Sequence, residues 1–291
     1  MRRANAIEDE SKQIGTVKDL TSVFESIAST QVAKVKNKVK LSKEFFDLLW
    51  EQYSALRIDP STRITGRDRV SVSATKENVF VIISAEAGLS GDIDQRLVER
   101  MLKDYKEETT DIVVLGSHGA AQLEQRKVPY VRFFQVPESD SYIDVSPVIE
   151  AVHPYRHIVV YYEEYVSLGV QNIKRIDLIS NIKEMSEDAD EDAITEQETI
   201  FEPSIDYIAD EMEKNMMTLA LSQTILESSL AQSASRFNAM ALAKDTATDL
   251  LKDYKLEYHR AKRSESDRRM REVLISLKKK KRSSKGRGRR R

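Results

Sequence analysis

The last third of the chain carries apolar side chains at steps that alternate between four and three residues. Twelve of the fifteen positions in this series are apolar or aromatic: Met212, Met216, Leu219, Gln223, Leu226, Leu230, Ser233, Phe237, Met240, Lys244, Ala247, Leu251, Tyr254, Tyr258 and Ala261. This spacing is typical of the seam of a coiled coil. No proline follows Pro203, and no glycine lies between Gly169 and Gly286. The sequence therefore predicts one helix over residues 204–281, which at 1.5 Å per residue would be ~115 Å long.

The N-terminal segment, residues 1–60, shows the same spacing. Its series is Ala28, Val32, Val35, Val39, Ser42, Phe46, Leu49, Tyr53 and Leu56. We predict a helix over residues 16–57 that ends before Pro60, because proline disfavours helical geometry in the residue before it. Neither apolar seam is stable in water, so the two terminal helices are expected to pair with each other. The spacing alone allows either orientation.

The middle of the chain, residues 75–182, has a different pattern. Segments rich in β-branched and aromatic residues at 78–88, 111–119, 128–136 and 157–165 are typical of strands, and 170–180 is typical of a further strand at an edge. An amphipathic stretch that Asp92 opens separates the first two, and a short helix is expected over 146–152. Strand, helix and strand at this spacing predict a Rossmann-like, mostly parallel α/β domain inserted between the terminal helices.

The net charge of −2 conceals two blocks of opposite sign. An acidic connector is expected over 183–203, because Glu184 to Glu213 includes thirteen acidic residues and no basic one. Lys278 to Arg291 contains ten basic residues and no acid, and we expect its last part, 282–291, to be a tail beyond the helix. Such a tail favours contact with a polyanion, either nucleic acid or anionic lipid, although a merely solvated tail has the same composition.

Candidate catalytic chemistry is sparse. The absence of cysteine excludes disulfides, thiol catalysis and thiolate zinc sites. The loop 85–92 follows a strand and opens a helix, but it lacks the glycines and lysine of a phosphate-binding loop. Ser117 and His118 are adjacent without an evident third member of a triad, and the four histidines lack metal-ligand spacing. We therefore expect no catalytic residue, no metal, no cofactor and no direct nucleotide contact. The residues indicate a paired-helix protein with a mechanical or scaffolding role.

The C-terminal helix also carries a resemblance to a known family. The stretch from Ser235 to Ser266 resembles a signature of the gamma subunit of rotary F-type ATP synthases, through Arg236, Ala239, Met240, Ala243, Asp245, Ala247, Leu256, Tyr258 and Ala261. The N-terminal stretch resembles the family's other signature through Leu20, Thr21, Phe24, Ile27 and Ala28. The loop after the first strand is similar to a third conserved segment through Ser84, Gly88, Leu89 and Gly91. Together these segments cover almost the whole chain, in the family's order.

The resemblance implies a central-stalk rotor whose terminal helices form an antiparallel coiled coil inside the hexamer of alpha and beta subunits. The α/β domain would lie by the epsilon subunit and the membrane c-ring, and catalysis would belong to the beta subunits. The chain would be a peripheral membrane protein on the cytoplasmic face of a bacterial plasma membrane. The residues that the resemblance places against the hexamer are Leu20, Thr21, Phe24, Ile27, Arg236, Met240, Asp245, Arg263 and Asp267.

Several positions depart from the family's pattern. Lys244 stands where the family has Thr, Arg263 where it has Gln, and Asp267 where it has Thr. The basic tail extends past the usual C-terminus. Two alternatives follow: a gamma-like shaft of an F-type ATPase that does not pump protons, and a coiled-coil adaptor that binds a polyanion through its tail.

Overall fold

The computed structural model describes residues 4–55, 76–136, 144–178 and 205–287. Two long helices, α1 (Ala4–Ala55) and α7 (Ile205–Arg287), flank a five-stranded sheet in the sequence. The chain divides into two compact units: residues 1–25 with 240–291, and residues 26–239. The expected acidic connector at 183–203, seam residue Leu56 and the last four residues of the basic tail lie outside the described residues.

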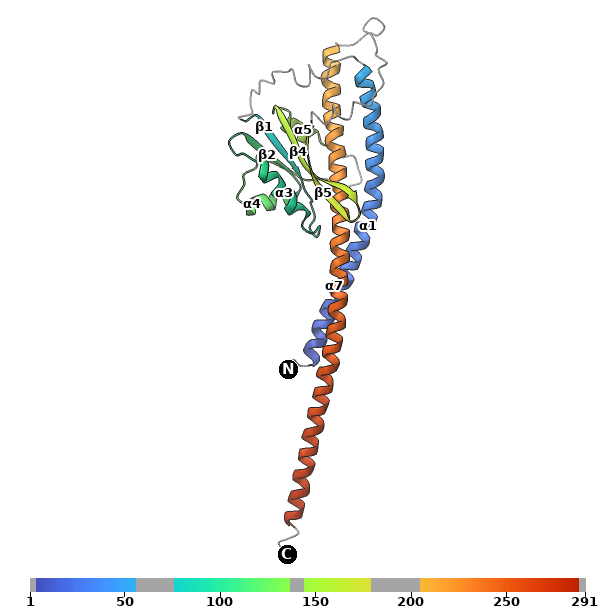
Figure 1. The fold of residues 1–291 in the computed structure, drawn as a ribbon, viewed down its shortest axis with the longest axis vertical. Coiled ribbons are helices and arrows are strands. Elements are labelled where there is room, and N and C mark those ends of the chain that lie inside the picture. Colours follow the sequence, from blue (N-terminus) through green and yellow to red (C-terminus); the bar gives the residue numbers. More distant parts are fainter. Residues whose placement is uncertain (1–3, 56–75, 137–143, 179–204, 288–291) are drawn as a thin grey trace. The chain divides into compact units, whose positions relative to one another are not determined.

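The sheet confirms the predicted α/β class. Its strands are β1 (Asn78–Ile83), β2 (Thr110–Leu115), β3 (Arg132–Phe134), β4 (His157–Ser167) and β5 (Val170–Asp177), in the order β3-β2-β1-β4-β5 (Figure 1). The pairs β1–β2, β1–β4 and β2–β3 are parallel, and β5 pairs antiparallel with β4 at one edge, where a strand was expected. Both faces of the central strands are buried, which explains their nearly unbroken apolar sequence.

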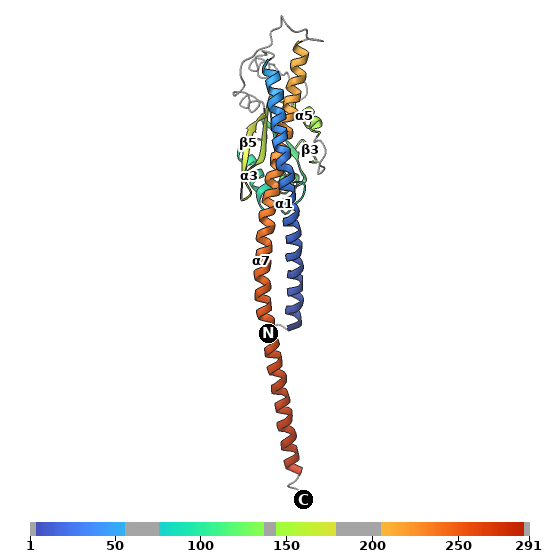
Figure 2. The same cartoon turned by 90° about the vertical axis from the view of Figure 1, so that its right-hand side faces the viewer.

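Three short helices belong to the sheet domain. They are α3 (Ile93–Asp104), α4 (Ser117–Gln125) and α5 (Ser146–Val152). Residues Leu97, Val98 and Met101 of α3 and Leu123 of α4 pack on one face of the sheet with Phe80 and Tyr161 among others. The opposite face packs against α5 and against α7, whose contributions are Met216, Met217, Ala220, Leu221 and Ile225. The long C-terminal helix is therefore part of the sheet domain's core (Figures 1 and 2).

The expected strand over 111–119 is wrong beyond Leu115, because the chain turns at Gly116 and continues as α4. Gly116 has φ of +99°, a conformation that favours glycine. Its N–H donates to the carbonyl of Phe134, and a Cβ atom at this position would lie 2.1 Å from the carbonyl oxygen of Ser84. This backbone contact, which the strand pattern does not report, fixes the turn between β2 and α4.

Two glycine substitutions are expected to act in opposite directions. Gly116→Ala places a methyl group against the Ser84 carbonyl and requires alanine to adopt a left-handed backbone conformation. We therefore expect the free energy of unfolding to fall by about 3 kcal/mol. Gly15→Ala lies within α1, where nothing stands within 4 Å of the new methyl group. It should stabilise the helix by about 0.5–1 kcal/mol. Chemical denaturation of the full chain measures both changes, and equal effects would contradict this account of Gly116.

Candidate functional site

The apolar seam of α7 is buried as its spacing predicts. Every described side chain in the predicted series, from Met216 to Ala261, is buried or half-buried. The same holds for the series in α1 at Ala28, Val32, Val35, Val39 and Ser42, and it extends toward the N-terminus through Thr21, Ile14 and Ile7 to Ala4. Met212, Phe46, Leu49 and Tyr53 lie outside the described side chains. Both long helices therefore present a continuous seam.

The two terminal segments of unit 1 pair antiparallel, the orientation that the resemblance implies. Ala4 and Ile7 pack with Ala261, and Tyr254 and Tyr258 lie against this cluster. The N–H of Ala4 donates to Oε1 of Glu265 at 3.2 Å, which places the start of α1 beside a late turn of α7 (Figure 2). Further along α1, Glu25 reaches back to Lys244.

The lysine at position 244 has an internal partner. Its ammonium group donates to Oε2 of Glu25, and both side chains are largely covered, with 32% and 19% of their surface exposed. The pKa of Lys244 is raised, chiefly by this hydrogen bond. The lysine that replaces the family's threonine therefore pairs with α1 inside this unit.

A second face of α1 is apolar and exposed. Leu20, Phe24 and Ile27 are spaced by four and three residues, so they share one face of the helix. Their exposed fractions are 53%, 38% and 50%. Thr21, by contrast, is buried in the seam and donates to the carbonyl of Lys18 at 2.8 Å. We call Leu20, Phe24 and Ile27 the α1 stripe.

Arg236 is engaged within unit 2. Its Nε donates to the carbonyl of Gly88 at 3.1 Å, and its Nη2 donates to the carbonyl of Ala87 at 2.8 Å. One residue earlier on α7, the hydroxyl of Ser235 donates to the carbonyl of Ser90 at 2.7 Å. These bonds attach α7 to the loop between β1 and α3.

The loop 84–92 consequently serves as a docking segment for α7. Its carbonyl groups accept hydrogen bonds from α7, and the N–H of Ala85 donates to Oδ1 of Asp94 at 2.9 Å. Leu89 and Gly91 have φ of +70° and +73°, which lets the loop turn sharply before α3 begins at Ile93. The backbone amide of Ala85, near the end of β1, is therefore already paired with an acidic side chain.

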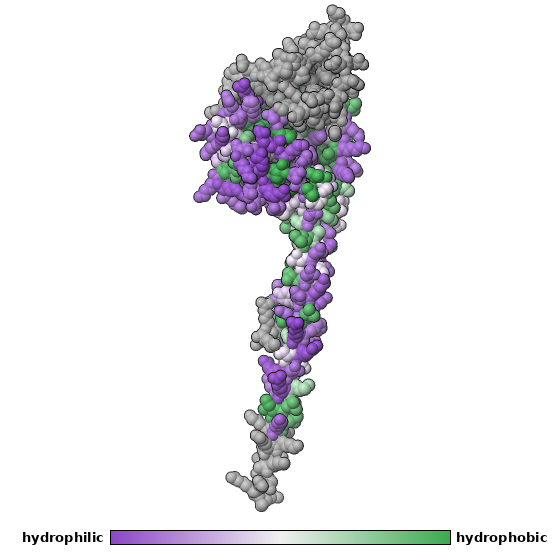
Figure 3. Space-filling model, in the orientation of Figure 1, coloured by the Kyte–Doolittle hydropathy of each residue, from purple (hydrophilic) through white to green (hydrophobic). Residues whose placement is uncertain are grey.

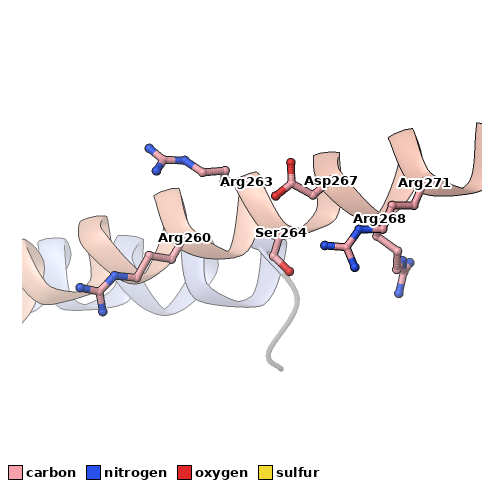
Figure 4. Close-up of a pocket in the computed structure, with 6 residues that line it drawn as sticks. All are labelled: Arg260, Arg263, Ser264, Asp267, Arg268 and Arg271. Atoms are coloured by element: carbon pink, nitrogen blue, oxygen red, sulfur yellow. The ribbon is translucent and has the colours of Figure 1, made fainter. Parts of the chain in front are cut away.

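Arginines gather on α7 in unit 1. Arg260, Arg263, Ser264, Asp267, Arg268 and Arg271 line a hollow of about 400 Å³ on the surface of this helix (Figure 4). Arg263 and Asp267 project from the same side of the helix in Figure 4, so two of the three positions that depart from the family's pattern are neighbours. Both are exposed, as is Asp245, whereas Met240 is buried in the seam. The hollow offers a largely cationic surface.

Ser117 and His118 have separate acidic partners. The hydroxyl of Ser117 donates to Oε2 of Glu86, and Nδ1 of His118 lies 3.3 Å from Oδ2 of Asp94. Among the described residues no group of three or more acidic or histidine side chains has the geometry of a metal site. In the same ranges, no helix is both long and apolar enough to cross a bilayer.

The sequence pattern did not reveal a second stripe on α7. Met217, Leu221 and Ile225 pack on the sheet. The same side of the helix continues with polar residues, which are Thr224, Ser228, Gln232 and Ser235. These polar residues interrupt the apolar signal. A run of small and amide side chains at steps of four and three, beside an apolar seam, was the signal that could have indicated it.

The fold defines a class of coiled-coil proteins in which a mostly parallel sheet domain is inserted between two terminal helices. In this class the long C-terminal helix packs both on the N-terminal helix and on the sheet. Known proteins narrow the class. The family model described as ATP synthase matches residues 3–274, so the chain belongs to this family, as a gamma-type chain.

Relatives and solved structures agree with this family. The ATP synthase gamma chain of Alkaliphilus metalliredigens is 22% identical over 272 residues, which cover 90% of this chain and 93% of the relative. A structure of the Euglena gracilis mitochondrial ATP synthase, with OSCP, F1 and c-ring, contains a chain with TM-score 0.65 and 15% identity. That match covers 94% of each chain. A rotor chain of the same enzyme in another rotational state has TM-score 0.59 and 16% identity, over 89% of this chain and 98% of that one.

Arg236 is expected to hold the docking loop. Arg236→Ala removes two hydrogen bonds to loop carbonyls. Hydrogen bonds from a charged donor contribute more than neutral ones, so we expect the free energy of unfolding of unit 2 to fall by about 1–3 kcal/mol. Arg236→Lys keeps the charge but cannot form both hydrogen bonds in the same geometry, so its stability should lie between those of the parent and the alanine variant. Chemical denaturation measures the change, and an alanine variant as stable as the parent would contradict this role.

Proposed function

We propose that this chain is the central-stalk rotor of an F-type ATP synthase and couples rotation of an ion-driven membrane ring to ATP synthesis or hydrolysis in an alpha-beta hexamer. The family match and the fold support this function. The catalytic residues belong to the partner subunits, and this chain transmits movement to them.

The observation that carries the proposal is the exposed apolar surface of the two long helices. The α1 stripe is exposed, and so are Met270, Val273, Leu274, Ile275 and Leu277 near the end of α7. Figure 3 shows this last group as a green patch on α7 just before the grey end. Clustered apolar side chains on a surface mark contacts with other proteins. A bore lined by the alpha and beta subunits would cover them.

The continuity of α7 suits the transmission of torque. This helix has 83 residues and would be ~125 Å long at 1.5 Å per residue. It contains no proline, and sharp kinks in helices arise mainly at proline or at inserted groups. An uninterrupted ladder of backbone hydrogen bonds resists bending and twisting, so rotation at one end reaches the other with little loss.

The predicted contact residues take two roles in this proposal. Leu20, Phe24, Ile27, Asp245, Arg263 and Asp267 are exposed and would meet the alpha-beta hexamer directly. Thr21, Met240 and Arg236 lie in the seam or against the docking loop, and they would act by positioning the helices. The arginine-lined hollow favours an acidic partner loop.

We infer the remaining partners by analogy with the family to which the chain belongs. The sheet domain would contact the epsilon subunit and the c-ring, which attaches the chain to the membrane as a peripheral protein. In a bacterium this places it on the cytoplasmic face of the plasma membrane. The α-helical ends would point into the catalytic hexamer, with no direct contact to nucleotide.

Substitution in the α1 stripe separates assembly from folding. Leu20→Asp should leave the free energy of unfolding of the isolated chain nearly unchanged, because the side chain is exposed. It should weaken recovery of the alpha-beta hexamer about tenfold or more, since burial of a leucine contributes roughly 1.5–3 kcal/mol. Ser22→Asp adds the same charge at another exposed position and is the control. Co-purification of tagged chain with ATPase activity in the eluate measures the effect, and equal recovery of both variants would contradict the proposed contact.

The basic segment from Lys278 to Arg291 is proposed to contact a polyanion. Ten cationic side chains in fourteen residues give strong, salt-dependent attraction to phosphate groups. A chain that ends at Leu277 should still assemble with the hexamer. Its binding to duplex DNA or to phosphatidylserine vesicles should lose most of its salt dependence. Failure of the shortened chain to assemble would contradict a peripheral role for this segment.

A further inference from the structure

Glu163 on β4 is a carboxyl group buried within unit 2. None of its surface is exposed. Its Oε2 atom accepts hydrogen bonds from the hydroxyl of Ser228 and from Nε2 of Gln232, both at 2.7 Å. Gln232 also donates to the Ser228 hydroxyl at 3.1 Å, so both donors on α7 are directed to one oxygen of the carboxyl group.

The other oxygen of Glu163 has no donor. Among the described residues, Oε1 is buried without a hydrogen-bond donor within reach. The side chain of Glu163 instead faces Asp94 at the start of α3, and Asp94 is itself only 2% exposed. Asp94 already accepts bonds from the N–H of Ala85 and from the hydroxyl of Ser90, at 2.9 and 2.8 Å. Two ionised carboxylates cannot hydrogen-bond each other, and like charges in a buried site strongly disfavour double ionisation.

We propose that Glu163 carries a proton on Oε1, donates it to Asp94, and so forms a proton-dependent latch that holds α7 against the loop between β1 and α3. The proton turns the unpartnered Oε1 atom into a hydrogen-bond donor and removes the charge repulsion between Glu163 and Asp94. Both oxygens of Glu163 are then satisfied, because Oε2 accepts twice and Oε1–H donates once.

The electrostatic setting supports the protonated form. Burial raises the pKa of Glu163 well above its ordinary value, and the charge of Asp94 raises it further. The α7 groups that bind it, Ser228 and Gln232, are uncharged. His118 of α4 contacts Asp94 and has 40% of its side chain exposed.

The neighbouring charges have other partners or lie farther along the same elements. Glu164 of β4 pairs with Lys174 of β5, and Glu86 of the loop accepts from Ser117 and Val136. On α7, Arg236 binds loop carbonyls, and Glu227 faces Tyr162 of β4. Burial raises the pKa of Glu227 too, so this residue needs its own control.

The latch would weaken as pH rises. A carboxyl group whose pKa is raised in the folded chain is protonated there and ionised in the unfolded chain between the two pKa values. Its contribution is complete below the unfolded pKa, about 4.3, and is lost as pH rises through the folded pKa. Within that window the unfolding equilibrium shifts about tenfold per pH unit.

Glu163→Gln provides the test, because its amide mimics the protonated acid in shape and donors. In the purified full-length chain we expect E163Q to flatten the fall in stability between pH 5 and the folded pKa and to be more stable than the parent at neutral and alkaline pH. Hydrogen exchange at 84–94 and 228–236, compared with the parent at equal pH, should slow in E163Q at alkaline pH. Glu227→Gln is the matched control and should leave the exchange difference at 84–94 unchanged.

Infrared spectroscopy reports the proton directly. The band of a protonated carboxyl group should be present in the parent at neutral pH, persist in E227Q and be lost in E163Q. If E163Q does not fold, Asp94→Asn decides the question, because its amide can donate to an ionised Glu163 and should also remove the band. A band that persists in D94N, or an E163Q chain with the parent's pH dependence, would overturn the latch. The measurements use the chain alone and do not depend on assembly into an ATP synthase.

Discussion

The structure depends on one stretch of α7, residues 216–240, that has to satisfy two partners at once. One side of this stretch supplies the seam that continues along the helix, and another packs on the sheet through Met217, Leu221 and Ile225. Side chains that serve two interfaces leave little freedom for the helix to rotate about its own axis. The polar bonds from Ser228, Gln232 and Arg236 then fix its position along that axis. Through these contacts the sheet domain and the long helix behave as one body within unit 2.

This double use explains why part of the fold could be read from the sequence and part could not. The seams followed from spacing alone, because a step of four and three is a local property that packing preserves. The strands followed from runs such as Asn78–Ile83, in which both faces are buried. Helix α4 was missed because it depends on the contact of Gly116 with Ser84, which lie 32 residues apart. Periodicity carries no record of such a contact.

The candidate site divides in the same way. Leu20, Phe24 and Ile27 could be singled out by resemblance, and the structure adds that all three are exposed. The hydrogen bonds of Arg236 and the Lys244–Glu25 pair could not be predicted from the sequence. The bonded residues lie 149 and 219 positions apart, so only the three-dimensional structure shows these contacts. Glu163 and Glu164 are adjacent acids in the same strand. Glu163 is buried because α3 and α7 pack over it, whereas Glu164 pairs with Lys174, and the strand sequence alone does not show this difference. Burial is decided by distant segments, so a local pattern cannot identify such a residue.

The bond between Ala4 and Glu265 has a consequence for biosynthesis. The two residues are 261 positions apart, so α1 emerges from the ribosome long before its partner segment exists. At ~5–20 residues per second, the apolar seam of α1 waits roughly 13 to 52 s for the last turns of the pair. During that interval the sheet domain can fold, whereas the apolar seam of the nascent N-terminal helix stays exposed to solvent. The order of synthesis therefore leaves the seam of α1 without its partner segment on α7 until translation is nearly complete.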